Sequence, residues 1–390
     1  MNTNETADTD WIDYAQWVGQ AVRRMRAEPG QKIGLFDSSV PEPVELLSST
    51  VKAAFEQGAP DSYVSVFLRN HPELANQLAD RYQVPIESIL CTTGATMAVD
   101  YVFRALAGPG DHVLIEHPGF DIFASAAISN GIDYSFFERP APDFAVRVDA
   151  VLAAIRPQTR IVVLTDLHNP SGVRADEEAL KALAKALGER GICLMVDEVY
   201  ADYAADGWNG LDINAFPNVV RIGSLTKTFG LSSLRFGWMF VGADVFGPIS
   251  TKLRKLDFGV SKLAHSVASE VFHQAALYDQ WRDQLISAAR PVARAHLSAM
   301  QDAGLLSLDT RFESCVCFPR VTDVSDTRAL SRWLTENHDI IVVPGECFGQ
   351  PGHIRVGFAQ PVEVLTEGLR RLEAGLTEYR RTMARQQKIA

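Results

Sequence analysis

The sequence predicts an α/β protein with a mostly parallel sheet, followed by a smaller α+β unit. Short, continuous apolar runs recur through the middle of the chain and alternate with segments whose apolar residues follow helical spacing. This alternation is typical of parallel strands that are buried on both faces and joined by helices. Beyond about residue 280 the pattern changes to longer helices and shorter strands. A chain of 390 residues is long enough for about two or three domains.

The strands of the larger unit are predicted from its apolar runs, which occupy residues 112–116, 160–165, 192–197, 219–223 and 238–241. Between the second and third runs, apolar residues recur at helical spacing over residues 176–187. Another apolar helix is predicted over residues 97–106, after a strand that ends near Cys91. These elements together predict the mostly parallel sheet.

The C-terminal part is predicted to begin with a long helix over residues 282–303. Further strands are predicted over residues 311–318, 340–343 and 353–358, and further helices over residues 328–336 and 363–380. We therefore expect three parts: residues 1–50 as an N-terminal segment that joins the small domain, residues 51–280 as the large domain, and residues 281–390 as the small α+β domain.

Charge and composition disfavour several classes of function. The net charge of −11 disfavours nucleic acid as the main partner, because phosphate backbones are bound by basic surfaces. No apolar run approaches the roughly 18 residues of a membrane span, and the polar, acidic N-terminus predicts a cytoplasmic protein. The 5 cysteines are odd in number and sparse, which indicates a reducing compartment. We interpret Cys315 and Cys317 as core thiols and predict no metal site.

The strongest sign of chemistry lies in residues 224–237, around Lys227. Ser224 stands three residues before this lysine, Arg235 stands eight residues after it, and apolar residues follow. A desolvated lysine has a lowered pKa and forms Schiff bases with carbonyl compounds such as pyridoxal phosphate (PLP). The hydroxyl and the guanidinium would then serve its phosphate. This segment alone fits a buried structural lysine equally well.

Other candidates stand where predicted strands end, which is where open α/β sheets bind ligands. Asp197 ends one strand and is suited to pair with a protonated pyridine nitrogen, although a helix N-cap is the common alternative. Tyr200 follows it and either donates its hydroxyl to a cofactor oxygen or only packs. Asn169 lies in a tight loop with Pro170 and Gly172, where its amide faces a ring oxygen or forms an Asx turn.

Three more positions have a ligand-binding and a structural interpretation. Gly94, Ala95 and Thr96 begin a helix, and small residues there let backbone N–H groups approach an anion. Phe120 follows a strand, where it stacks on a flat heterocycle or joins the core. Arg355 lies inside an apolar strand and needs an anion, either a protein carboxylate or the carboxylate of a substrate.

In this order, the motifs resemble the fold-type I PLP-dependent aminotransferases of class I/II, over nearly the whole chain. The resemblance is carried by Gly94-Ala95-Thr96, Phe120, Asn169-Pro170-Ser171-Gly172, Asp197 with Tyr200, Ser224 with Lys227, Arg235 and Arg355. It implies a seven-stranded type of sheet in a large PLP-binding domain. It also implies transfer of the amino group from an L-α-amino acid to a 2-oxo acid through a Schiff base between PLP and Lys227.

The resemblance also implies roles for single residues. Lys227 would carry the substrate α-proton, Asp197 would pair with the ring nitrogen, and Asn169 and Tyr200 would hold the phenolic oxygen. Phe120 would stack on the ring.

The remaining roles concern the phosphate and the substrate. The phosphate would be bound by Gly94, Ala95, Thr96, Ser224 and Arg235. Arg355 would bind the substrate carboxylate, with Asn169 and Ser39 also in the substrate site. Tyr63 would reach the phosphate of a neighbouring subunit, which implies a homodimer with shared active sites.

One departure from the family pattern and one likeness to a subgroup leave the reaction open. Residues 37–43 stand where many members carry a glycine-rich substrate-covering segment. Residues 343–358 resemble a subgroup that contains capreomycidine synthase, so PLP-dependent elimination or cyclisation of a functionalised amino acid is the alternative. A PLP-sensing regulatory module is disfavoured by the complete catalytic set. A nicotinamide oxidoreductase is disfavoured because Gly108-Pro109-Gly110 precedes a strand instead of a helix.

Overall fold

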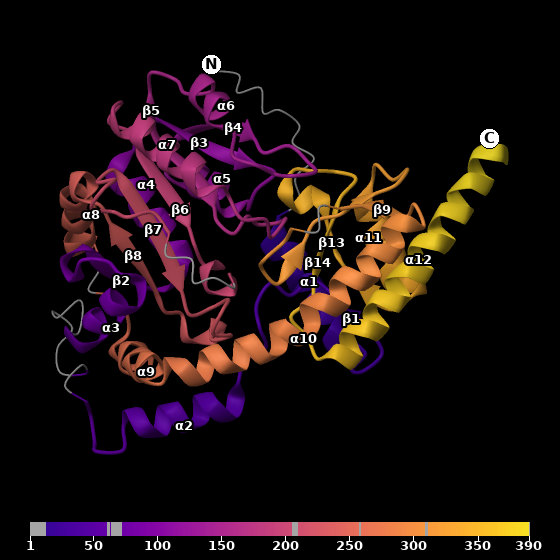
Figure 1. The fold of residues 1–390 in the computed structure, drawn as a ribbon, viewed down its shortest axis with the longest axis horizontal. Coiled ribbons are helices and arrows are strands. Elements are labelled where there is room, and N and C mark those ends of the chain that lie inside the picture. The colour runs from indigo at the N-terminus through magenta and orange to yellow at the C-terminus, as the bar shows by residue number, and fades with distance from the viewer. Residues whose placement is uncertain are drawn as a thin grey trace.

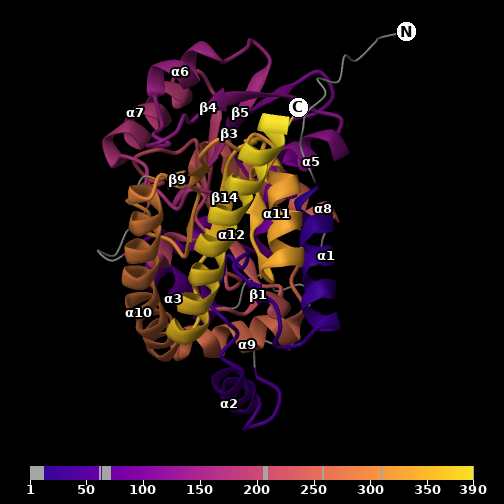
Figure 2. The ribbon, with the colours of Figure 1, turned by 90° about the vertical axis from the view of Figure 1, so that its right-hand side faces the viewer.

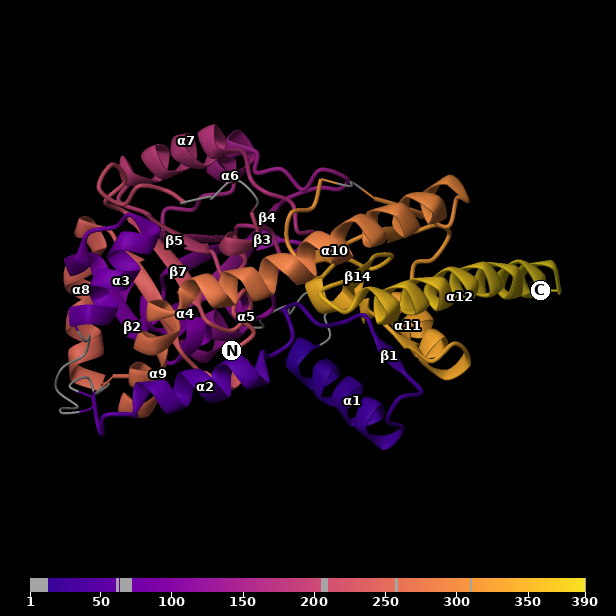
Figure 3. The same ribbon diagram turned by 60° about the horizontal axis from the view of Figure 1, so that its bottom comes forward.

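The computed structural model describes residues 13–60, 63, 72–204, 210–256, 259–308 and 311–389. Two units lie side by side and are bridged by the long helix α10 (Ala275–Asp302), which runs from one into the other (Figures 1 and 3). The larger unit contains the sheet, and the smaller one contains short strands and long helices.

The sheet of the larger unit has seven strands in the order β2-β8-β7-β6-β5-β3-β4. Strand β8 is reversed relative to the other strands, so its pairs with β2 and β7 are antiparallel, and the prediction of a mostly parallel α/β sheet is confirmed. The strands are β2 (Ile89–Thr92), β3 (His112–His117), β4 (Asp133–Glu138), β5 (Thr159–Thr165), β6 (Cys193–Asp197), β7 (Val219–Ser224) and β8 (Gly237–Val241). The edge strand β4 was not predicted, because its exposed and half-buried residues give no continuous apolar run.

Helices cover both faces of this sheet, which explains why its central strands are apolar along their whole length. Alternate residues of each strand point to opposite faces, so the sheet contributes to two hydrophobic clusters. One face is covered by α3 (Pro72–Tyr82), α6 (Val148–Ala153), α7 (Glu177–Gly188) and α9 (Lys262–His273). The other face is covered by α4 (Gly94–Leu106), α5 (Ile122–Ser129) and α8 (Ala243–Leu256).

The smaller unit packs its helices on short strands. Its helices are α1 (Tyr14–Ala27), the C-terminal part of α10, α11 (Thr327–Asn337) and α12 (Val362–Ile389). Figure 2 shows α1 beside α11, with α12 next to them. The strands are β1 (Ile33–Gly34), β9 (Leu306–Ser307), β10 (Val316–Cys317), β11 (Arg320–Val321), β12 (Ile340–Ile341), β13 (Val343–Pro344) and β14 (Ile354–Gly357).

The N-terminal segment contacts both units. Strand β1 pairs in parallel with β12 of the smaller unit, whereas α2 (Val44–Ala54) packs against α9 of the larger one. We keep the division into residues 1–50, 51–280 and 281–390 as a proposal.

One predicted element is much shorter than expected. The strand predicted over residues 311–318 is reduced to β10, because the Ser314 hydroxyl bonds to the N–H and the carbonyl oxygen of Val316 and turns the chain there. No helix within the described residues is long and apolar enough to cross a membrane.

Candidate active site

The first group of predicted residues meets where helix α4 begins. Gly94 has a φ of +77°, and a Cβ built on it would lie 2.5 Å from Arg235 Nη2. A Cβ on Gly237 would lie 2.7 Å from the Gly94 carbonyl carbon, and Gly237 pairs with Ser224 across β7 and β8. Backbone N–H groups, a hydroxyl and a guanidinium therefore gather at one place, which we call the α4 corner (Gly94–Thr96, Ser224 and Arg235).

Lys227 and Asp197 line one cavity from the ends of adjacent strands. Lys227 Nζ donates to Ser38 Oγ at 2.8 Å, and burial lowers the pKa of its amine. Burial also raises the pKa of Asp197 to about 6, although its Oδ1 accepts the Val199 N–H at 3.1 Å. Among the described residues, no cation forms an ion pair with Asp197. The buried carboxylate therefore carries a desolvation cost that a bound cation would offset.

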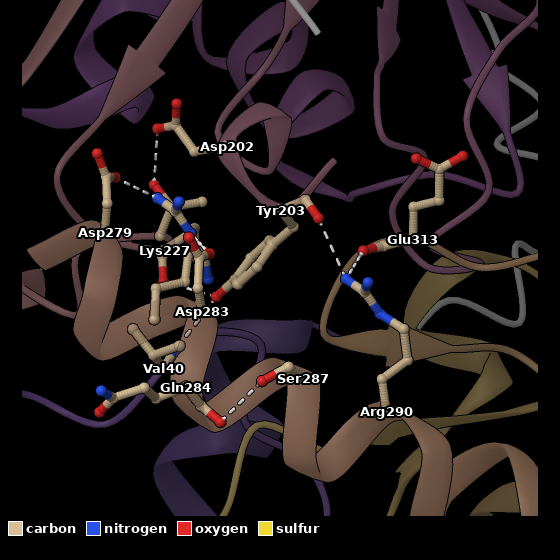
Figure 4. Close-up of polar contacts among 12 residues, drawn as sticks. Val40, Asp202, Tyr203, Lys227, Asp279, Asp283, Gln284, Ser287, Arg290 and Glu313 are labelled. Carbon is tan, nitrogen blue, oxygen red and sulfur yellow. Dashed lines mark hydrogen bonds and ion pairs between the residues drawn. The ribbon is translucent and has the colours of Figure 1, made fainter. Parts of the chain in front are cut away.

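The main chain at Lys227 is held by Tyr203, as Figure 4 shows. The Tyr203 hydroxyl donates to the Lys227 carbonyl oxygen at 2.8 Å and accepts the Val40 N–H at 3.1 Å. Arg290 of α10 donates to the carbonyl oxygens of Tyr203 and Glu313. The backbone of the lysine is thus connected to the N-terminal segment and, through α10, to the smaller unit.

Arg355 enters the same cavity from β14 of the smaller unit. This fully buried guanidinium donates to Asn169 Oδ1 at 3.1 Å, to the Phe36 carbonyl oxygen at 3.0 Å and to the Tyr14 hydroxyl. Its Nε has no hydrogen-bond partner in the described part of the chain. A buried guanidinium with an unused donor is suited to a carboxylate ligand.

Tyr14 and Ser38 line this cavity but were missed by the sequence analysis. The Tyr14 ring centroid lies 5.6 Å from that of Phe120 and 5.0 Å from Arg355 Cζ. The backbone N–H of Tyr14 donates to Asp121 Oδ2 at 2.9 Å. Asp13 as the N-cap of α1 was the available signal that a helix begins at Tyr14. Nothing local links Tyr14 to an arginine 341 residues further along the chain.

A buried polar network supports the loop that carries Asn169. Thr165 Oγ1 accepts the Asn169 N–H at 2.9 Å and donates to Glu116 Oε1 at 2.6 Å. Arg139 pairs with Glu116 at 2.7 Å, and both side chains are fully buried. Burial raises the pKa of Glu116 to about 7, while Arg139 and Thr165 oppose that rise by stabilising the carboxylate. The backbone of Asn169 is therefore positioned by Thr165 at the end of β5, which is itself held by the buried Glu116–Arg139 pair.

The other predicted residues lie as follows. Phe120 and Tyr200 line the cavity with Lys227, whereas Ser39 does not, and its neighbour Ser38 takes that place. Tyr63 is exposed, with its ring centroid 6.0 Å from that of Phe55. Its role at a neighbouring subunit stays a prediction. Within the described ranges, no group of three His, Cys, Asp or Glu side chains is arranged to hold a metal ion.

Comparison with protein families identifies the relationship. The family model "Aminotransferase class I and II" matches residues 41–372. The chain belongs to the class I and II aminotransferases. The match runs from the segment before α2 into α12, so it includes the sheet, the α4 corner and Arg355. This aminotransferase is therefore a PLP-dependent enzyme of fold type I, as the sequence predicted.

Curated relatives carry different activities. The aminotransferase is 28% identical to capreomycidine synthase of Streptomyces vinaceus over 307 residues, which is 77% of this chain and 76% of that protein. It is 30% identical to histidinol-phosphate aminotransferase of Haloferax volcanii over 311 residues, with 78% and 80% covered. The family is thus clear, while the relatives named differ in what they act on.

Solved structures share the fold. Aspartate aminotransferase from Thermus thermophilus with maleate superposes with a TM-score of 0.82 at 21% identity, covering 93% of this chain and 97% of that one. An aminotransferase from Mycobacterium tuberculosis gives a TM-score of 0.80 at 22% identity, with 94% and 96% covered.

The residues of the aminotransferase fit PLP. The α4 corner offers N–H groups, a hydroxyl and a guanidinium at a helix N-terminus, which suits a phosphate. Asp197 is a buried carboxylate with no ion pair to a described cation, which suits a protonated pyridine nitrogen. Lys227 offers an amine whose pKa is lowered by burial, which suits covalent attachment to an aldehyde.

Proposed function

We propose that the enzyme transfers the amino group of an L-α-amino acid to a 2-oxo acid, with Lys227 as the residue that attaches PLP. The observation that carries this proposal is the convergence of three groups on one cavity. Lys227 and Asp197 enter from adjacent strand ends, and Arg355 enters from the smaller unit. This set combines a nucleophilic amine, a counter-ion for the cofactor ring and a binding group for a substrate carboxylate.

In the proposed mechanism, Arg355 binds the substrate carboxylate through donors that include its unused Nε. Bound PLP supplies an electron-withdrawing ring that takes up negative charge when the substrate Cα–H bond breaks. Lys227 Nζ accepts the α-proton as a general base and later returns a proton as a general acid. A lowered pKa favours this role, because it increases the neutral fraction of the amine. Asp197 stabilises the proton on the ring nitrogen.

The remaining site residues would hold the cofactor in place. We assign the phosphate to the α4 corner, the ring face to Phe120, and the phenolic oxygen to Asn169 and Tyr200. We also propose a cytoplasmic homodimer in which Tyr63 reaches the phosphate of the second subunit. The support is the family relationship and the exposed position of Tyr63.

Elimination or cyclisation of a functionalised amino acid is the second candidate. It is favoured by the relationship to capreomycidine synthase and by the likeness of residues 343–358 to that subgroup. Both candidates use the same lysine and the same cofactor. They differ in what happens after the α-proton has left.

A panel of amino acids, with products identified by mass spectrometry, tests the proposal. A transaminase given an amino acid alone stops after about one equivalent of 2-oxo acid per site, and continuous turnover requires an added 2-oxo acid. Continuous release of ammonia or of a cyclic product from the amino acid alone would instead identify the second candidate. Lys227→Ala provides the background rate for both measurements.

A further inference from the structure

A second cavity, of about 170 Å³, lies between helices α1 and α11 of the smaller unit. None of the residues that line the cavity at Lys227 contributes to it. Its walls include Trp17 and Arg24 from α1, and Arg328 and Arg332 from α11. Figure 2 shows the two helices side by side. We call this cavity the arginine crevice (Trp17, Arg24, Arg328 and Arg332).

The crevice concentrates positive charge on a chain whose net charge is −11. Arg328 Nε lies 3.5 Å from Asp326 Oδ1 and 4.0 Å from Glu346 Oε1, so the positive charge of this guanidinium is partly balanced by two carboxylates. Arg24 and Arg332 form no ion pair with any carboxylate among the described residues. Arg328 also lies in the first turn of α11, at the positive end of the helix dipole. Like charges that converge repel one another, and a bound anion would relieve that repulsion.

The three arginines of the crevice stand on helices instead of loops, and their side chains are exposed. Trp17 and Arg24 are seven residues apart, and Arg328 and Arg332 are four apart, so each pair lies on one face of its helix. The Trp17 ring packs edge-on against Phe36, with centroids 6.0 Å apart. This packing fixes one wall of the crevice.

The two hydroxyl groups that line the crevice are already used. The Ser331 hydroxyl donates to the Val342 carbonyl oxygen at 2.7 Å, and the Thr335 hydroxyl donates to the Ser331 carbonyl oxygen at 2.7 Å. The donors left for a ligand are therefore mainly guanidinium N–H groups. Such donors match the oxygens of a phosphoryl group, because their planar fork forms paired, charge-assisted hydrogen bonds.

We propose that the arginine crevice binds a small phosphate-bearing anion and thereby fixes helix α1 over the active site. An anion held by Arg24 on one side and by Arg328 and Arg332 on the other joins α1 to α11. The first residue of α1 is Tyr14, whose hydroxyl contacts Arg355 in the active site. Fixing α1 therefore favours the arrangement in which Tyr14 lies at Arg355. This second half rests on the proposed function, because it expects a substrate carboxylate on Arg355.

Calorimetric titration of the PLP-loaded enzyme with pyrophosphate, at constant ionic strength, tests the binding half. We expect saturable binding that weakens at least about tenfold in the double variant Arg24→Gln/Arg332→Gln, which removes two charge-assisted contacts. Arg23→Gln is the matched control, because it removes an exposed charge from α1 that does not line the crevice. It should bind as the parent does.

Three results would overturn the binding half. They are the absence of saturable binding, equal weakening in Arg23→Gln and in the double variant, and loss of binding through Arg355→Gln alone. The last result would place the anion in the active site. This titration uses no substrate. It therefore tests whether the arginine crevice binds the anion even if the enzyme transaminates none of the amino acids offered.

The coupling half is tested by the KM of the amino donor with saturating pyrophosphate and with chloride. We expect pyrophosphate to lower this KM by about fivefold, a typical size for coupling between two sites, with little change in kcat. Tyr14→Phe should still bind pyrophosphate but lose the response. An unchanged KM in the parent enzyme, or an equal response in Tyr14→Phe, would overturn the coupling.

Discussion

The two sides of the active site are built in different ways. Asn169, Asp197 and Lys227 each follow or end one of the adjacent parallel strands β5, β6 and β7. Tyr14 and Arg355 instead come from opposite ends of the chain and meet only through tertiary packing. We call the first group the strand-end side and the second the rim. The difference indicates that substrate binding can change at the rim while the cofactor-binding side keeps its strand-end geometry.

The largest effect is expected from Lys227→Ala on the strand-end side. Loss of the general base should lower kcat by about a thousandfold or more, and the covalent attachment of PLP should be lost. Borohydride reduction followed by mass spectrometry measures that attachment directly. Lys181→Ala, which removes a partly exposed lysine from α7, should leave both unchanged. A PLP adduct that persists in Lys227→Ala would break the assignment of the strand-end side.

Asp197→Asn should have opposite effects with and without cofactor. Burial raises the pKa of Asp197 from 3.8 to about 6, so at intermediate pH the folded PLP-free protein holds a proton that the unfolded chain releases. The contribution of Asp197 to stability therefore falls as the pH rises through this window. Above about pH 6 the substitution removes a cost on the order of 3 kcal/mol.

Urea unfolding of the PLP-free proteins measures this difference. Asp197→Asn should be the more stable protein near pH 8, and the difference should vanish below about pH 3, where the carboxyl is protonated in both states. The variant should nevertheless bind PLP more weakly, because it offers no counter-ion to the ring nitrogen. Equal pH profiles for the two proteins would contradict the burial argument.

At the rim, Arg355→Gln should raise the KM of the amino donor by about a hundredfold, since a charge-assisted, paired contact to a carboxylate is lost. The amount of bound PLP should be unchanged, because Arg355 lies outside the proposed cofactor contacts. A loss of PLP that parallels the loss of activity would show that rim and strand-end side are not separable.

The smallest effect is expected from Tyr14→Phe, which keeps the ring edge-on to Phe120 and removes the hydroxyl that contacts Arg355. We expect KM to rise by about three- to tenfold, because one hydrogen bond that positions Arg355 is lost, with kcat nearly constant. Tyr134→Phe on the edge strand β4 is the matched control. A fall in kcat without a change in KM would move Tyr14 from substrate binding to the chemical step.

The strand-end side was predictable because its signals are local. Apolar runs identify β5, β6 and β7, and a polar residue after each run lies at the ligand-binding edge of a parallel sheet. Lys227 needed its own segment together with Asn169 and Asp197, because the segment alone fits a buried structural lysine equally well. The confirmed α/β class follows from the same local patterns, and the confirmed PLP dependence follows from the family resemblance that these residues carry.

The rim was harder to predict because it depends on distant contacts. Arg355 was suggested by its apolar strand, but its bonds to Asn169 and Tyr14 were not. Residues 37–43 carry no sequence pattern that distinguishes Ser38 from its neighbours. Its hydroxyl nevertheless accepts a hydrogen bond from Lys227. The shortening of the strand predicted near residue 314 has a different, local cause, since the Ser314 hydroxyl bonds to Val316 and redirects the chain.

The two covalent crossings between the units set how they can move. The described chain passes from the smaller to the larger unit between β1 and α2, and it returns once through α10. Val40 lies on the first crossing and bonds to Tyr203, while Arg290 lies on the second and bonds to the same residue. Because the two units are joined at these two crossings, one unit rotates most easily relative to the other about the line through both crossings. Because Tyr203 contacts both crossings and bonds to the Lys227 carbonyl oxygen, Lys227 lies near that line and would move least.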